Sequence, residues 1–140
     1  MTDTNVDGAT LKTLAGKLLE LLKIRTLPIA MKQYTSREDM EKVPGLRWPT
    51  EGRRHTTCQL VTQARMAGFT LGIGADNVRP GSNCGGVMGI DQPVEACLSG
   101  EHMDGVWFEN REAAHQHQLQ MTRVPTGKFM GTVVSPLRTG

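Results

Sequence analysis

The stretch "TTCQLVTQARMAGFTLGIG", residues 56–74, joins a helix pattern directly to a strand pattern and decides the fold. Thr56 or Thr57 can cap the start of a helix, and Gly68 can end it. The segment 69–74 then has the length and the apolar character of a short strand. A helix is therefore predicted over 56–68, with Cys58 in its first turn, followed at once by a strand.

Outward from this stretch, the patterns predict further elements on both sides. Helices are expected at 10–24, 36–43, 92–100 and 110–121, and strands at 28–34 and 127–137. We expect the last strand to pair with residues 28–34. Three main helices and a small sheet make a single small mixed α+β domain over 10–140, preceded by a flexible tail over 1–9.

The helix at 10–24 has an amphipathic pattern. Leucines recur at helical spacing at positions 11, 14, 18 and 21 or 22, and Thr10 is the expected N-cap. We expect this leucine face to pack on the core. A dimer contact through Leu19 or Leu22 is the alternative.

Composition excludes several classes of function. The 140 residues carry 16 basic and 14 acidic side chains, a formal net charge of +2, which does not favour binding to nucleic acid or to an anionic membrane. No apolar run reaches membrane-spanning length, and the N-terminus lacks a signal-peptide pattern. We expect a cytoplasmic protein, in which three cysteines stay reduced and do not form a disulfide framework.

Cys58 and Cys84 are the strongest candidates for chemistry. Unpaired N–H groups and the helix dipole stabilise a thiolate in a first helical turn, the expected place of Cys58, although a packed apolar cysteine is the alternative. Cys84 lies in "ADNVRPGSNCGG", residues 75–86, which is expected to be a turn-rich loop, with a helical turn starting in "GGVMGI", residues 85–90. The N–H groups of Gly85 and Gly86 can form an anion-binding nest for a thiolate or a bridging sulfide, and glycine lets a bulky cluster approach. If the fold brings the two cysteines together, they make half of a four-thiolate site.

Cys97 has a more ordinary setting, so packing is the first expectation and a third metal ligand the second. His102 is a candidate fourth ligand. No spacing matches a familiar zinc module, and His115 and His117 are expected on the surface. A rival use of Cys58 or Cys84 is nucleophilic catalysis, and His55 lies near Cys58 in the sequence, but no signature of such an enzyme is present.

In order along the chain, several segments resemble the domain-of-unknown-function family 169. They are "LLKIRTLPIAMKQ", "RRHTTCQLVTQARMAG", "NCGGVMGI", "SGEH" and "VPTGKFMGTVVSPL", and the resemblance spans about residues 11–138. It implies occurrence mainly in archaea and anaerobic bacteria. It also implies that this chain corresponds to the N-terminal half of the usual family length, because longer members carry two further cysteines in a second half.

These observations lead to one main hypothesis and two alternatives. The protein is expected to be a small metal-binding, iron–sulfur subunit of a redox or anaerobic metabolic enzyme. Its cluster would be held by Cys58 and Cys84, with Gly85 and Gly86 beside it, and with zinc as the alternative metal. Cys97, a second copy in a homodimer, or another subunit of a larger complex would complete the site. The alternatives are a non-catalytic accessory subunit with buried thiols and a small thiol-dependent enzyme.

Overall fold

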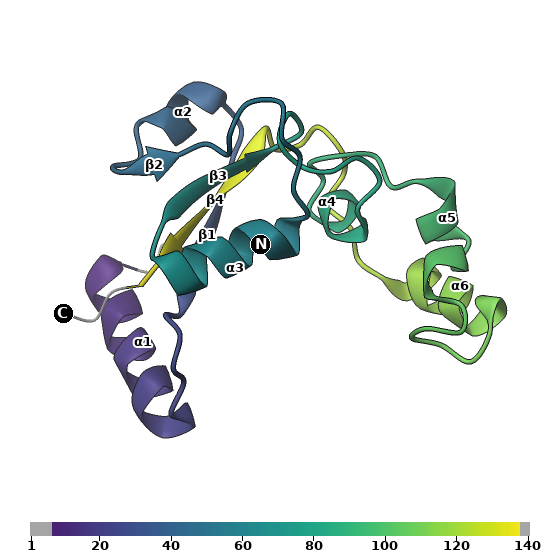
Figure 1. The fold of residues 1–140 in the computed structure, drawn as a ribbon, viewed down its shortest axis with the longest axis horizontal. Helices are drawn as coiled ribbons and strands as arrows, with labels where there is room; N and C mark the ends of the chain where they lie inside the picture. The colour runs from purple at the N-terminus through teal and green to yellow at the C-terminus, as the bar shows by residue number, and fades with distance from the viewer. Residues whose placement is uncertain (1–6, 138–140) are drawn as a thin grey trace.

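The computed structural model describes residues 7–137, and it has the α+β architecture that the sequence predicts (Figure 1). Its elements in chain order are α1 (Gly8–Leu22), β1 (Ile29–Tyr34), α2 (Arg37–Glu41), β2 (Leu46–Arg47), α3 (Thr57–Ala67), β3 (Thr70–Gly74), α4 (Asn83–Val87), α5 (Glu95–Leu98), the 3-10 helix η1 (Glu101–Met103), α6 (Arg111–Gln120) and β4 (Gly131–Pro136). The three longest of these helices are α1, α3 and α6, which are the three main helices expected from the sequence.

The four strands form one mixed sheet in the order β1-β4-β3-β2. β4 pairs antiparallel with β1, from Ile29 opposite Pro136 to Tyr34 opposite Gly131, which confirms the predicted pairing of the last strand with residues 28–34. β4 also pairs antiparallel with β3 on its other side. The two-residue strand β2 runs parallel to β3 within a segment that reads as loop in the sequence.

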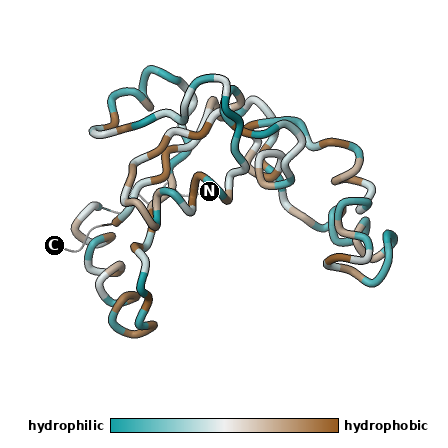
Figure 2. The backbone as a smooth tube through the Cα atoms, viewed as in Figure 1, coloured by the Kyte–Doolittle hydropathy of each residue, from teal (hydrophilic) through white to brown (hydrophobic). Residues whose placement is uncertain are grey.

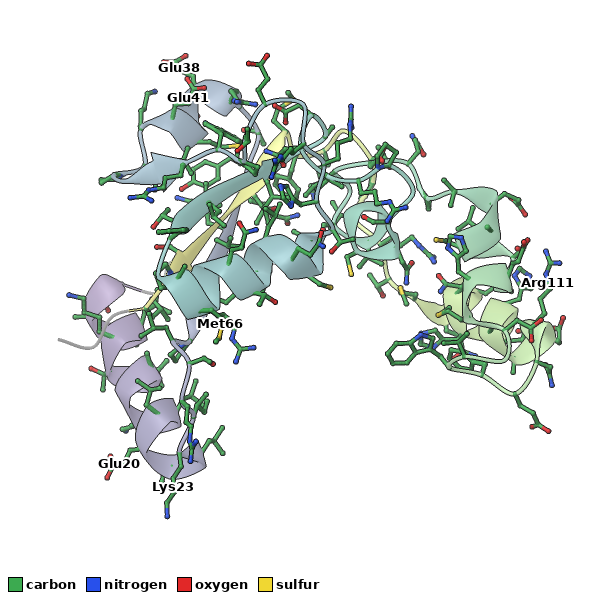
Figure 3. All side chains as sticks on the ribbon, in the orientation of Figure 1. Glu20, Lys23, Glu38, Glu41, Met66 and Arg111 are labelled. Atoms are coloured by element: carbon green, nitrogen blue, oxygen red, sulfur yellow. The ribbon has the colours of Figure 1, made fainter. Side chains whose placement is uncertain are left out.

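Helix α3 packs on this sheet and supplies much of the core. Leu60 and Ala64 are fully buried against Ile73 of β3 and Val134 of β4. Met66 is 70% exposed and points away from the sheet (Figure 3). The alternation of brown and teal along α3 reflects this division of its faces (Figure 2). Burial of one face and exposure of the other is typical of an amphipathic helix.

Local sequence signals within residues 56–74 set both ends of α3. Thr56 accepts a hydrogen bond from the Gln59 N–H, and the Gln59 side chain accepts one from the Thr56 N–H, which completes a capping box. Gly68 ends the helix with a φ of 71°, in the left-handed region that favours glycine. The predicted helix and the strand that follows it are thereby confirmed.

Helix α1 departs from the prediction in its cap and in its packing. Asp7, not Thr10, caps it, because the Asp7 carboxylate accepts hydrogen bonds from the N–H groups of Ala9 and Thr10 at 2.8 and 2.9 Å. Residues 7–9 therefore belong to the cap and first turn. The predicted flexible tail over 1–9 is wrong for these three residues, and the rest of it lies outside the described residues.

The leucine face of α1 is largely uncovered. Ala15 is the buried residue of this helix, whereas Leu14 is 49% exposed and Leu21 is 76% exposed. α1 projects from one end of the sheet, while α5 and α6 lie at the opposite end of the molecule (Figure 1). The expected packing of the leucine face on the core is thus wrong. Periodicity reports which face of a helix is apolar, but it does not report what covers that face. No helix within residues 7–137 has the length and apolarity needed to cross a membrane.

Candidate functional site

Cys58 and Cys84 occupy equivalent positions in two different helices. Each is the second residue of its helix, and each follows a hydroxyl side chain that caps the helix, Thr56 for α3 and Ser82 for α4. The Ser82 hydroxyl accepts a hydrogen bond from the Gly85 N–H at 3.1 Å. Both sulfurs are therefore presented by a capped first helical turn.

A backbone bridge between distant parts of the chain brings these two turns together. The His55 N–H donates to the Asn77 carbonyl at 2.9 Å, and the Arg79 N–H donates to the His55 carbonyl at 2.7 Å. The bridge joins the residues just before α3 to the segment that leads into α4. Buried Asn77 braces that segment, since its side chain accepts from the Gly74 N–H and donates to the Gly72 carbonyl.

As a result, the Sγ atoms of Cys58 and Cys84 lie 3.8 Å apart. Both cysteines are exposed to solvent and neither forms a disulfide. The sequence places these residues 26 positions apart, so their convergence is produced by the fold. The expectation that folding could unite Cys58 and Cys84 is met in this structure.

Cys84 lies on the short helix α4 rather than in a loop, and this corrects the expected role of the two glycines. The Gly85 N–H donates to the Ser82 hydroxyl, and the Gly86 N–H donates to the Ser82 carbonyl at 3.1 Å. Because both donors already have acceptors, the anion nest expected from Gly85 and Gly86 is not formed. Both glycines are buried, and a Cβ at Gly86 would lie 3.0 Å from Cβ of Pro93. Their small size serves close packing behind Cys84.

The pair favours the protonated form of Cys84. Partial burial raises the pKa of the Cys84 thiol above its usual value of 9.0, and the neighbouring Cys58 raises it further. A thiol with a raised pKa is a poor nucleophile at neutral pH, because the thiolate is the reactive form. A metal ion reverses this preference, since it deprotonates a thiol that binds it.

Cys97 does not join this pair. It is 2% exposed, and its sulfur lies 3.2 Å from Nδ1 of His102 and 3.5 Å from the Gly81 carbonyl oxygen. Burial raises the pKa of the Cys97 thiol. Within residues 7–137, no three side chains of His, Cys, Asp or Glu gather in a way that could hold a metal ion. The expected three-thiolate arrangement of Cys58, Cys84 and Cys97 is therefore not formed within these residues.

The remaining histidines have local roles. His115 Nδ1 lies 2.8 Å from the Leu98 carbonyl oxygen and helps to join α6 to α5. The exposed His117 ring packs beside Phe108, with 5.0 Å between ring centroids. His55 lines a shallow hollow beside Cys58 and belongs to the backbone bridge described above.

Two hollows flank the sulfur pair and differ in character. One, with a volume of ≈ 440 Å³, has a mixed lining that includes the polar side chains of Arg79 and His102. The other, with a volume of ≈ 530 Å³, is almost entirely apolar, and apart from the two cysteines its lining contains no titratable side chain. We call it the apolar hollow, and its other lining residues are Thr57, Val61, Thr62, Asn83, Val87, Met88 and Met121. Sequence analysis missed this lining, since no local pattern signals that these residues meet.

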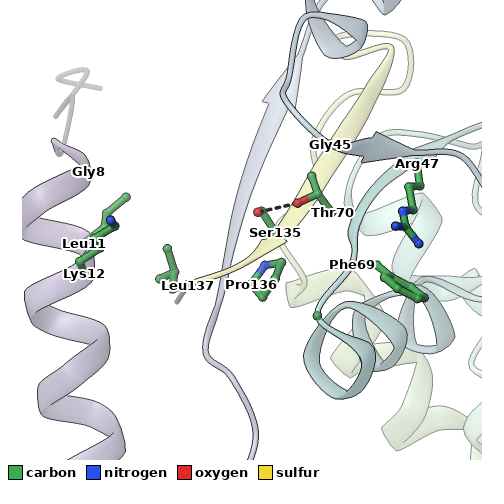
Figure 4. A pocket seen from close by; sticks show the side chains of 11 residues that line it. Gly8, Leu11, Lys12, Gly45, Arg47, Phe69, Thr70, Ser135, Pro136 and Leu137 are labelled. Carbon is green, nitrogen blue, oxygen red and sulfur yellow. Dashed lines mark hydrogen bonds between the residues drawn. The ribbon is translucent and has the colours of Figure 1, made fainter. Parts of the chain in front are cut away.

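A separate groove lies at the other end of α3, between the sheet and the start of α1 (Figure 4). It has a volume of ≈ 620 Å³ and includes Lys12, Arg47 and a hydrogen-bonded pair of hydroxyls from Thr70 and Ser135, 2.9 Å apart. The Arg47 guanidinium is already stacked on Phe69, 4.4 Å from the ring centroid. Among residues 7–137, the lining of this groove contains no cysteine or histidine, so the sulfur pair is the stronger candidate for chemistry.

Comparison with protein families matches most of the chain to a family model. Residues 17–139 match the family model DUF169, which is described as "Uncharacterised ArCR". The match covers most of the chain and includes both cysteines of the pair. No curated protein and no solved structure matches the chain.

Proposed function

The chain belongs to the DUF169 family, and on this premise we propose that it is a metal-binding protein whose cysteine pair holds one metal atom. Cys58 and Cys84 would be the protein ligands. The observation that carries this proposal is the distance of 3.8 Å between their sulfurs.

This distance fits two ligands of a single metal ion. Two thiolates bound at about 2.3 Å with a tetrahedral angle between them lie about 3.8 Å apart. The thiols are exposed, so an ion can reach them without unfolding the protein. Thiolate ligands select soft or borderline metals, among which zinc and iron in iron–sulfur centres are common in proteins.

The distance between the two sulfurs also indicates which type of iron–sulfur cluster the pair could bind. In a two-iron cluster with four cysteine ligands, each iron binds two cysteines, whereas in a four-iron cluster each cysteine binds a different iron. The pair therefore supports a two-iron cluster or a single ion more than a four-iron cluster. Bound iron would supply electron transfer to a redox enzyme of which this chain is a subunit, and bound zinc would supply a structural link.

The two alternatives are less well supported at this pair. An accessory protein with buried thiols agrees with Cys97, but Cys58 and Cys84 are exposed. A thiol-dependent enzyme needs a thiolate nucleophile, and the raised pKa of Cys84 favours the thiol.

The test is the content of iron, zinc and acid-labile sulfide per chain after purification without oxygen. The proposal expects metal in the wild type and in Cys97→Ser, and loss of almost all of it in Cys84→Ser. Cys97→Ser is the matched control, because it removes a sulfur that lies outside the pair. Equal metal content in the wild type and in Cys84→Ser would contradict the proposal.

A further inference from the structure

We infer that the site is shared by two copies of this chain, with Cys58 and Cys84 of each copy binding across a two-fold axis. The inference rests on the proposed function and names the partner that completes the site. The metal would then have four thiolate ligands and would lie between the two chains.

The first argument is the incomplete ligand set. The two sulfurs fit one tetrahedral metal, which needs two further ligands. No third His, Cys, Asp or Glu joins them among residues 7–137. A second copy related by a two-fold axis supplies two sulfurs at the same spacing, and such isologous pairs are the commonest form of oligomer.

The second argument is the surface around the sulfurs. On a two-fold axis each residue near the axis faces its own copy, so a charged side chain there meets a like charge. The apolar hollow on one side of the pair has no charged side chain in its lining, whereas Arg79 lines the hollow on the other side, so the apolar side is the one that a second copy can cover. Val87 and Met121, which are partly exposed, offer apolar surface that a second copy would remove from water.

The third argument is the balance of charge. Four thiols that bind one divalent ion release four protons to solvent and leave a site with a net charge of −2. Cys58 lies in the first turn of α3, an 11-residue helix whose positive dipole end offsets part of that charge.

A shared site has a defined stoichiometry. A single ion would give half a metal per chain and no sulfide, and a two-iron cluster would give one iron and one sulfide per chain. In both cases the metal-loaded particle has the mass of two chains. The measurement is metal and sulfide per chain together with native mass spectrometry of the same anaerobic sample, before and after treatment with a chelator.

A second variant separates the interface from the ligands. Val87→Glu keeps both cysteines but places a carboxylate in the apolar hollow, where it would face its own copy. We expect it to reduce both metal content and dimer at least tenfold while the far-ultraviolet circular dichroism is unchanged. Val106→Glu is the matched control, because Val106 is 73% exposed and lies outside the hollow, so it should keep metal and dimer.

The outcomes distinguish failure of the shared site from failure of the proposed metal-binding function. A dimer with the stated stoichiometry that is lost in Val87→Glu supports the shared site. Full metal content in a particle with the mass of one chain overturns the shared site but leaves the metal-binding function intact, and so does full metal content in Val87→Glu. Absence of metal from the wild type overturns both.

Discussion

The chain presents sulfur in two contrasting settings. Cys58 and Cys84 lie at the starts of two helices, face each other at 3.8 Å, and are exposed to solvent. Cys97 is buried beside His102, with a contact of 3.2 Å between the sulfur and the imidazole Nδ1. Burial raises the pKa of both Cys84 and Cys97, so the direction of the pKa shift does not distinguish Cys84 from Cys97. The two settings differ in solvent access and in the spacing of the sulfurs, and these differences favour the proposed ligand chemistry for Cys58 and Cys84 and packing for Cys97.

The largest expected difference between the two settings is their rate of alkylation. In metal-free protein, we expect iodoacetamide to label Cys58 and Cys84 in the native state, because both sulfurs are exposed. Cys97 should react at least about 100-fold more slowly than these two cysteines, because it becomes accessible only when its surroundings open. Peptide mass spectrometry over a time course measures the three rates. Labelling of Cys97 as fast as that of Cys84 would show that its burial does not protect it.

A smaller effect is expected from a glycine substitution that disturbs only the surroundings of Cys97. Gly100 has a φ of 81°, and a Cβ there would lie 2.6 Å from the backbone nitrogen of His115 and 2.7 Å from the Arg111 carbonyl oxygen. Gly100→Ala should therefore lower the free energy of unfolding by about 2–4 kcal/mol, from backbone strain plus overpacking. Because this change loosens η1 against α6, it should also speed the alkylation of Cys97. Urea unfolding and the labelling time course measure both effects.

Gly105→Ala is the control for that substitution. Gly105 has a similar φ of 67°, but a Cβ there would meet nothing within 4 Å. It should cost only the strain of the left-handed conformation, about 1 kcal/mol. Neither alanine should reduce the metal content at Cys58 and Cys84. A fall of metal content in Gly100→Ala would mean that the two settings depend on each other.

The contrast between α3 and α4 shows which features of the site were predictable from the sequence. The cap of α3, its capping box and its terminal glycine are local signals, so the position of Cys58 in a first turn followed from the sequence. The same logic applies to α4, since Ser82 caps it. The turn-forming Pro80, Gly81 and Asn83 of this segment predict a loop instead. A hydroxyl residue three positions before Gly85 was the signal that could have identified this helix.

Two other features had no local signal. The approach of Cys58 to Cys84 depends on the bridge between His55 and Val78, which joins segments that are distant in sequence. The exposure of Leu14 and Leu21 depends on where α1 lies relative to the sheet. Both are consequences of tertiary arrangement, which the periodicity of a segment does not determine.

The smallest predicted effect is a change in the pH dependence of stability. Because burial raises the pKa of Cys97 in the folded protein above 9.0, the unfolded chain loses this proton first as the pH rises. The folded state then binds more protons than the unfolded state, so this stabilising contribution is complete below about pH 9 and is lost as the pH rises through the folded value. The slope of the free energy of unfolding at alkaline pH should therefore be less negative in Cys97→Ser than in the wild type, by at most about 1.4 kcal/mol per pH unit. Urea unfolding of metal-free protein at a series of pH values measures it, with Cys84→Ser as the parallel test of the exposed pair. An identical slope in the wild type and in Cys97→Ser would mean that Cys97 keeps its ordinary pKa, and the two settings would then differ in proton affinity as well as in access.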